Sequence, residues 1–170
     1  MSALVRSGNI TTATVDQLGL GGHDYSDADV DNISIIMPVV SRQVGIRLRN
    51  LPGGGVSDRQ WQGWREAGRQ IEVLELWSGR LGGRQGREVG RWCGKVGRVT
   101  IRSVEFDDFG AFIEAVVQAV GEVGSMCDLI TFRKSGEREE VVGLGGKMGW
   151  IVKDEKSEIF GGFEIVISKK

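Results

Sequence analysis

The sequence predicts an α/β fold in which strand-helix units stack into one array, with a parallel inner sheet and a C-terminal hairpin cap. Three observations predict it: an apolar pattern that recurs along the chain, a helix-period stretch after each copy, and a glycine pair within apolar alternation near the end. Each copy has apolar residues at positions i, i+2 and i+7. One strand and one helix cannot bury their apolar faces alone, so a recurrent unit of this size indicates stacking.

Four clear copies and one weaker copy follow one another. The first apolar position advances by 28, 28, 25 and 31 residues, and the second copy carries a three-residue insertion. The apolar positions are Leu18, Leu20 and Tyr25; Ile46, Leu48 and Val56; Leu74, Leu76 and Leu81; Val99, Ile101 and Phe106; and, in the weaker copy, Ile130 and Phe132.

A helix-period stretch follows each clear copy after a short polar or glycine pair. The clearest runs from Phe109 to Val120, where apolar residues recur at the spacing of an amphipathic helix. We interpret Asp107 and Asp108 as a helix N-cap and a first-turn carboxylate rather than a catalytic pair. Glycine pairs at the unit junctions indicate chain reversals; they are Gly21-Gly22, Gly82-Gly83 and Gly145-Gly146.

The third and fourth copies, LELWSGRL from Leu74 and VTIRSVEF from Val99, resemble the leucine-rich repeat family. The similarity is to the long strand-helix subtype of ribonuclease inhibitors and of the C-terminal arrays of NOD-like receptors. It covers about residues 15 to 152 and implies a right-handed horseshoe solenoid of about five units. The family pattern has Asn or Cys where this chain has Gly79 and Val104. Because that residue normally bonds the neighbouring turn, we expect irregular coils.

Residues 150 to 170 are predicted to form the cap of a single repeat domain that spans residues 1 to 170. Trp150-Ile151-Val152 can form a strand, and Asp154-Glu155-Lys156 is interpreted as a turn. Gly161-Gly162 lies between apolar alternations, which is typical of a two-residue hairpin loop. No comparable cover precedes Leu18, so we expect either pairing through the N-terminal end or a longer parent protein.

Composition excludes several classes of protein. A formal net charge of −1 with 26% charged residues is typical neither of a disordered tail nor of a general nucleic-acid binder. No apolar run reaches the roughly 18 residues that span a bilayer, and the first 14 residues lack a signal-peptide layout. We expect a soluble, cytoplasmic protein that binds neither nucleic acid nor membrane.

Catalytic and cofactor motifs are weak throughout the chain. His23, the only histidine, is interpreted as a loop residue because no spacing selects a serine partner for it. Cys93 and Cys127 form no C-x-x-C motif and are interpreted as buried apolar side chains. The glycine-rich run 143–149 matches neither the Walker nor the Rossmann spacing. We expect no enzyme, cofactor or metal, although a compact α/β enzyme with His23 beside a buried carboxylate stays open.

Function is predicted from the strand residues that alternate with the buried positions. In a horseshoe these residues line the inner surface, and arginine and tryptophan are the types most enriched among binding hot spots. We therefore expect a protein partner with an acidic surface. The resemblance implies ligand sensing or scaffolding in an immune-receptor-like protein; a substrate-recruiting adaptor is the alternative, although the chain has no F-box segment. The expected binding residues are Arg47, Arg49, Glu75, Trp77, Thr100, Arg102, Thr131 and Arg133.

Overall fold

A computed structural model describes residues 15–20, 24–52, 56–134, 136–157 and 162–170. Within these residues strands and helices alternate up to a final pair of strands. The strands are β1 (Val15–Leu20), β2 (Val40–Arg47), β3 (Val73–Leu81), β4 (Arg98–Phe106), β5 (Leu129–Lys134), β6 (Ile151–Ser157) and β7 (Gly162–Ser168). The helices are α2 (Asp27–Ile36), α3 (Asp58–Ala67), α4 (Gly83–Cys93), α5 (Phe109–Gly121) and α6 (Arg138–Met148), with 3-10 turns η2 (Met37–Val39) and η3 (Leu48–Asn50).

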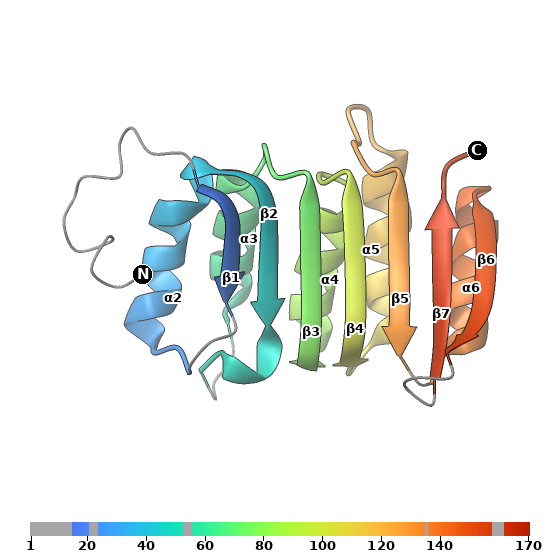
Figure 1. Cartoon of the computed structure of the whole chain (residues 1–170), viewed down its shortest axis with the longest axis horizontal. Coiled ribbons are helices and arrows are strands. Elements are labelled where there is room, and N and C mark those ends of the chain that lie inside the picture. The colour runs from blue at the N-terminus through green and yellow to red at the C-terminus, as the bar shows by residue number, and fades with distance from the viewer. Residues whose placement is uncertain (1–14, 21–23, 53–55, 135, 158–161) are drawn as a thin grey trace.

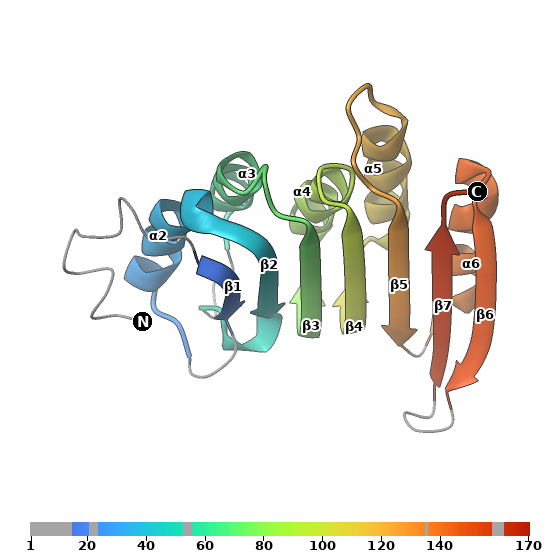
Figure 2. The same ribbon diagram turned by 45° about the horizontal axis from the view of Figure 1, so that its top comes forward.

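The strands form one seven-stranded sheet in the order β1-β2-β3-β4-β5-β7-β6 (Figures 1 and 2). The first five are sequential parallel neighbours. The last two form an antiparallel hairpin that joins the sheet through β7. This arrangement confirms the predicted α/β class, the mostly parallel sheet and the C-terminal hairpin.

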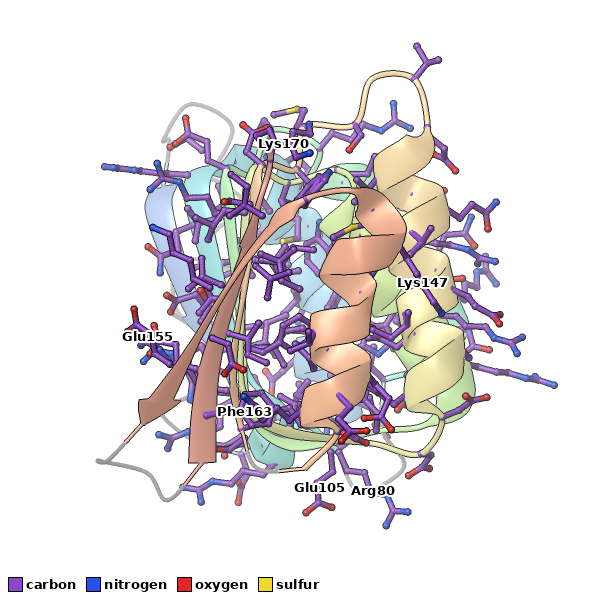
Figure 3. The ribbon with its side chains drawn as sticks, turned by 90° about the vertical axis from the view of Figure 1, so that its right-hand side faces the viewer. Arg80, Glu105, Lys147, Glu155, Phe163 and Lys170 are labelled. Carbon is purple, nitrogen blue, oxygen red and sulfur yellow. The ribbon has the colours of Figure 1, made fainter. Side chains whose placement is uncertain are left out.

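The helices cover one face of the sheet, and no helix of the described chain covers the other (Figures 2 and 3). We call that uncovered side the open face. The buried positions point toward the helices: Leu74, Leu76, Val99 and Ile101 are fully inaccessible, and Leu81 is 2% exposed. Phe106 is only partly buried. Residues between them therefore point to the open face.

The second copy has a different register from the predicted one. Val44 pairs with Leu74, and Ile46 pairs with Leu76, so Val44 and Ile46 occupy the two strand positions. Leu48 is buried in η3 instead. The predicted strand positions were therefore two residues too late in the sequence, because the pair Ile46 and Leu48 fits the same i, i+2 spacing as the pair Val44 and Ile46. Val40 begins β2 directly after η2, which has a proline in its first turn.

A left-handed backbone residue explains why the apolar positions i+2 and i+7 face the same side. Five residues of regular strand would place them on opposite faces. Ser78 (φ 52°) and Ser103 (φ 49°) lie opposite each other in β3 and β4, and each shifts the alternation by one residue. Leu81 therefore returns to the core side.

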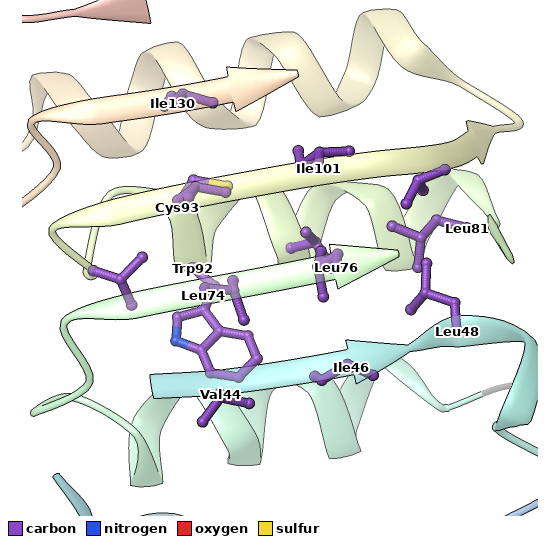
Figure 4. Packing of buried hydrophobic residues seen from close by; sticks show 14 of the residues in the cluster. Val44, Ile46, Leu48, Leu74, Leu76, Leu81, Trp92, Cys93, Ile101 and Ile130 are labelled. Atoms are coloured by element: carbon purple, nitrogen blue, oxygen red, sulfur yellow. The ribbon is translucent and has the colours of Figure 1, made fainter. Parts of the chain in front are cut away.

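The core consists of strand side chains packed against buried side chains of the helices (Figure 4). Trp61, Trp64 and Trp92 from α3 and α4 meet edge to face, with ring centroids 5.0 and 6.3 Å apart. Glycines let α4 approach α5 closely: a Cβ added at Gly90 would lie 2.8 Å from the Cβ of Ala115. Larger side chains there would push the two helices apart.

Glutamines at helix starts join consecutive units. Ser57 caps α3 in a capping box with Gln60, whose amide donates to Asp31 at 2.7 Å. One unit later, Gln85 accepts from the Gly82 amide and donates to the Val56 carbonyl at 2.8 Å. These bonds link the starts of α3 and α4 to the preceding unit.

Several local predictions were wrong. Asp154 to Lys156 belong to β6 rather than to a turn. Gly145-Gly146 lies within α6, where a Cβ at Gly145 would overlap Val152 of β6. Asp108 is the N-cap of α5, while Asp107 precedes the helix and pairs with Arg80. Gly21-Gly22, His23 and Gly161 lie outside the described residues.

Candidate functional site

A pocket of about 460 Å³ opens on the open face, at the ends of β2 and β5 and over the middle of β3 and β4. Neighbouring strands bring its main side chains into one row, because Arg47, Trp77, Arg102 and Arg133 pair in register from β2 to β5. We call it the arginine pocket. Its lining consists of Arg47, Glu75, Trp77, Ser78, Arg102, Ser103, Arg133, Lys134, Gly162 and Phe163.

Five of the eight expected binding residues line the arginine pocket: Arg47, Glu75, Trp77, Arg102 and Arg133. Thr100 and Thr131 lie in the same row as Glu75, where they pair with each other. Neither lines the pocket, and Thr131 is buried. Arg49 is not a strand residue; it lies in η3 and is exposed. That misplacement follows from the register of the second copy, which puts Gly45 opposite Glu75 and Arg47 opposite Trp77.

Trp77 is partly buried rather than fully exposed. Its indole lies across Gly45 of the neighbouring strand, since a Cβ built on Gly45 would meet two ring carbons at 2.7 Å. Gly79 is equally constrained, because a Cβ there would lie 2.5 Å from the Cβ of Leu48. The two glycines thus allow the indole and the η3 turn to pack closely on the strands beside them.

The positive charges of the pocket arginines are paired with carboxylates to different degrees. Arg133 makes two hydrogen bonds to Glu164, at 2.7 and 3.0 Å, which raise the pKa of its guanidinium. Arg102 reaches Glu75 only at 4.0 Å. The Nε of Arg47 is buried and has no hydrogen-bond partner within the described part of the chain. Arg47 and Arg102 are therefore the cations most able to bind an added anion.

Lys134 also lines the pocket, although the sequence pattern did not predict it there. Its ammonium is buried; it donates to the Val104 carbonyl at 3.1 Å and pairs with Glu137. It also lies 5.0 and 4.8 Å from the ring centroids of Phe106 and Phe109. These contacts fix the ammonium group in place and pair its charge within the protein. Alternation along β5 places Lys134 on the same side as the buried Ile130 and Phe132, so the pattern predicts a core position rather than a place in a pocket of the open face.

The cysteines are buried, as expected. Burial raises the pKa of the Cys93 thiol well above its usual value and that of Cys127 to about 11. Both thiols are therefore protonated and unreactive near neutral pH. Among the described residues, no group of three or more His, Cys, Asp or Glu side chains is placed to hold a metal ion.

Comparisons with known proteins leave the family open. No protein-family model matches the chain, and a search of curated proteins finds no match. Within the described residues, no helix is both long and apolar enough to cross a membrane. The assignment of function therefore depends on the geometry and charge of the open face.

Proposed function

We propose that this chain is a protein-recognition module whose open face binds acidic segments of partner proteins. The observation that carries the proposal is the arginine pocket, where Arg47 and Arg102 flank a partly exposed indole in one register row. Arginine and tryptophan supply charge-assisted hydrogen bonds and apolar contact area, the combination found at binding hot spots.

The proposal includes a leucine-rich-repeat-like solenoid as the framework. Five sequential parallel strands with their helices on one side support it, as do the glutamine links between units. A stacked array of this kind holds recognition residues on strands, where neighbouring units fix their spacing at about 4.8 Å. By the same resemblance, the module would sense a ligand or serve as a scaffold.

Panning a peptide display library with the purified chain tests the proposal. We expect the wild-type protein to select segments rich in Asp and Glu, with binding that weakens as salt rises. The double variant Trp77→Ala, Arg102→Ala should lose them, with the tryptophan contributing about 2 kcal/mol or more if it is a central anchor.

Arg98→Ala is the matched control, because Arg98 is exposed on the same strand as Arg102 but lies outside the pocket lining. It removes the same charge and should keep the selected binders. If the folded double variant captured them with unchanged affinity, the recognition proposal would be wrong.

A further inference from the structure

We propose that the arginine pocket accepts a single carboxylate from the ligand, and that Glu75 is a built-in competitor for the same arginine. This inference rests on the proposed recognition function and specifies the chemistry of its central contact. In the free protein Glu75 faces Arg102; in the complex the ligand carboxylate takes its place.

The ion pair between Glu75 and Arg102 is loose enough to exchange. Its closest nitrogen and oxygen atoms are 4.0 Å apart, whereas a hydrogen-bonded pair of this type has a separation of about 2.7–2.9 Å. Both side chains keep access to solvent, with Arg102 48% and Glu75 29% exposed. A ligand carboxylate can therefore reach the guanidinium without opening a buried contact.

The neighbouring pair shows the geometry that a bound carboxylate would adopt. Arg133, one strand away in the same row, holds Glu164 through its Nε and one terminal nitrogen at 2.7 and 3.0 Å. Arg102 has the same chemistry without such a partner. Arg47, which lies beyond Trp77 in the same row, also lines the pocket and adds a second positive charge beside a ligand that lies over the indole.

Charge favours a carboxylate over a phosphate. The lining contains four cations, Arg47, Arg102, Arg133 and Lys134. Three carboxylates oppose them, because Glu75, Glu164 and Glu137 each pair with one of these cations. One positive charge is left, which a singly charged ligand neutralises; a phosphate monoester carries close to two negative charges at pH 7.

The pocket also has room for the body of a side chain. Its volume of about 460 Å³ falls in the range of roughly 300–1,000 Å³ typical of ligand pockets. The partly exposed indole of Trp77 offers an apolar surface beside the two arginines. The occupant is therefore an acidic residue of a peptide whose neighbouring apolar atoms contact Trp77.

The experiment uses 3-phenylpropionate, a carboxylate with an apolar body, and its uncharged analogue 3-phenylpropionamide. Binding is followed by the indole N–H signal of Trp77 in nitrogen-15 NMR spectra, assigned with Trp77→Phe. We expect the carboxylate to shift this signal in a saturable way and the amide to have little effect. Equal responses to both probes would overturn the inference.

Variants then test the competition. Glu75→Gln should tighten binding of 3-phenylpropionate by about tenfold, because it removes the competing anion and its repulsion. Glu105→Gln changes net charge equally on the adjacent strand but lies outside the arginine pocket, so it should change affinity by no more than about twofold. Arg102→Ala should abolish the shift, while Arg98→Ala should not.

The outcomes separate the two proposals. If the probe binds as described but panning yields no acidic segments, the carboxylate site is supported and the protein-recognition proposal is wrong. If panning yields acidic segments that depend on Arg102, yet the carboxylate binds no better than the amide, the single-carboxylate site falls. Weaker probe binding by a folded Glu75→Gln variant would refute the competition, because a carboxylate that assists binding cannot be a competitor.

Discussion

Ser78 and Ser103 decide which side chains reach the open face at the end of their strands. Both adopt positive φ, a region that costs a non-glycine residue about 1–2 kcal/mol. The resulting shift lets Arg102 and Ser103 be exposed in succession while Val104 returns to the core. The backbone conformation of one residue thus connects the apolar spacing of the unit to the arrangement of side chains on the open face.

Substitutions at Ser103 should follow this backbone requirement. Ser103→Gly relieves the strain but gives the unfolded chain more freedom, so stability should change by less than about 1 kcal/mol. Ser103→Val should destabilise by about 2 kcal/mol, since a β-branched residue is disfavoured at positive φ. Denaturant unfolding measures both. Equal stability of the two variants would mean that residue 103 does not adopt this conformation in solution.

The buried thiol of Cys127 should make stability depend on alkaline pH. Its pKa is raised from 9.0 to about 11, mainly by burial, so folding favours the protonated form. The stabilisation is complete below pH 9 and is lost as pH rises through 11. Unfolding at pH 8 and pH 11 should show a larger loss for wild type than for Cys127→Ala. Identical losses would contradict a buried thiol at this position.

At the scale of elements, the distance between α4 and α5 depends on glycines that carry no side chain into the interface. Gly94, the C-cap of α4, makes a similar approach one turn after Gly90: a Cβ added there would lie 2.6 Å from Ala119. Gly90, inside the helix, lowers the intrinsic stability of α4 by about 1 kcal/mol relative to alanine. Close packing of the two helices over β3 and β4 offsets that cost.

Two alanine substitutions distinguish packing from helix propensity. Gly90→Ala should destabilise by about 1–2 kcal/mol, because the new methyl group would lie 2.8 Å from Ala115 and from a backbone oxygen of Phe112. Gly143→Ala in α6 meets nothing within 4 Å and should stabilise by up to about 1 kcal/mol. Thermal unfolding compares them. If both variants were stabilised, close approach of α4 and α5 would not explain Gly90.

At the scale of the molecule, much of the arrangement is predictable because the spacing of buried residues is regular. Leu74, Leu76, Val99 and Ile101 reveal two strands and their alignment, since burial on one face leaves few alternatives. The error in the second copy arose because two overlapping apolar pairs fit the same spacing. Side-chain alternation alone cannot choose between registers that differ by two residues.

The candidate site was predictable in part for the same reason. Arg102 and Arg133 follow from alternation on aligned strands. The contact of Trp77 with Gly45 was not predictable, because it crosses strands at the misaligned copy. The pairing of Arg133 with Glu164 depends on β7 lying between β5 and β6, an order that the local pattern of the hairpin does not determine.

A double-mutant cycle tests the central claim most directly. It combines Arg102→Ala with replacement of one glutamate by glutamine in an acidic peptide selected by panning, and it measures the four dissociation constants. We predict a coupling free energy of about 1.5 kcal/mol or more for one glutamate of the peptide, against almost none between that glutamate and Arg98. A coupling near zero for every glutamate would contradict recognition of a carboxylate by the arginine pocket.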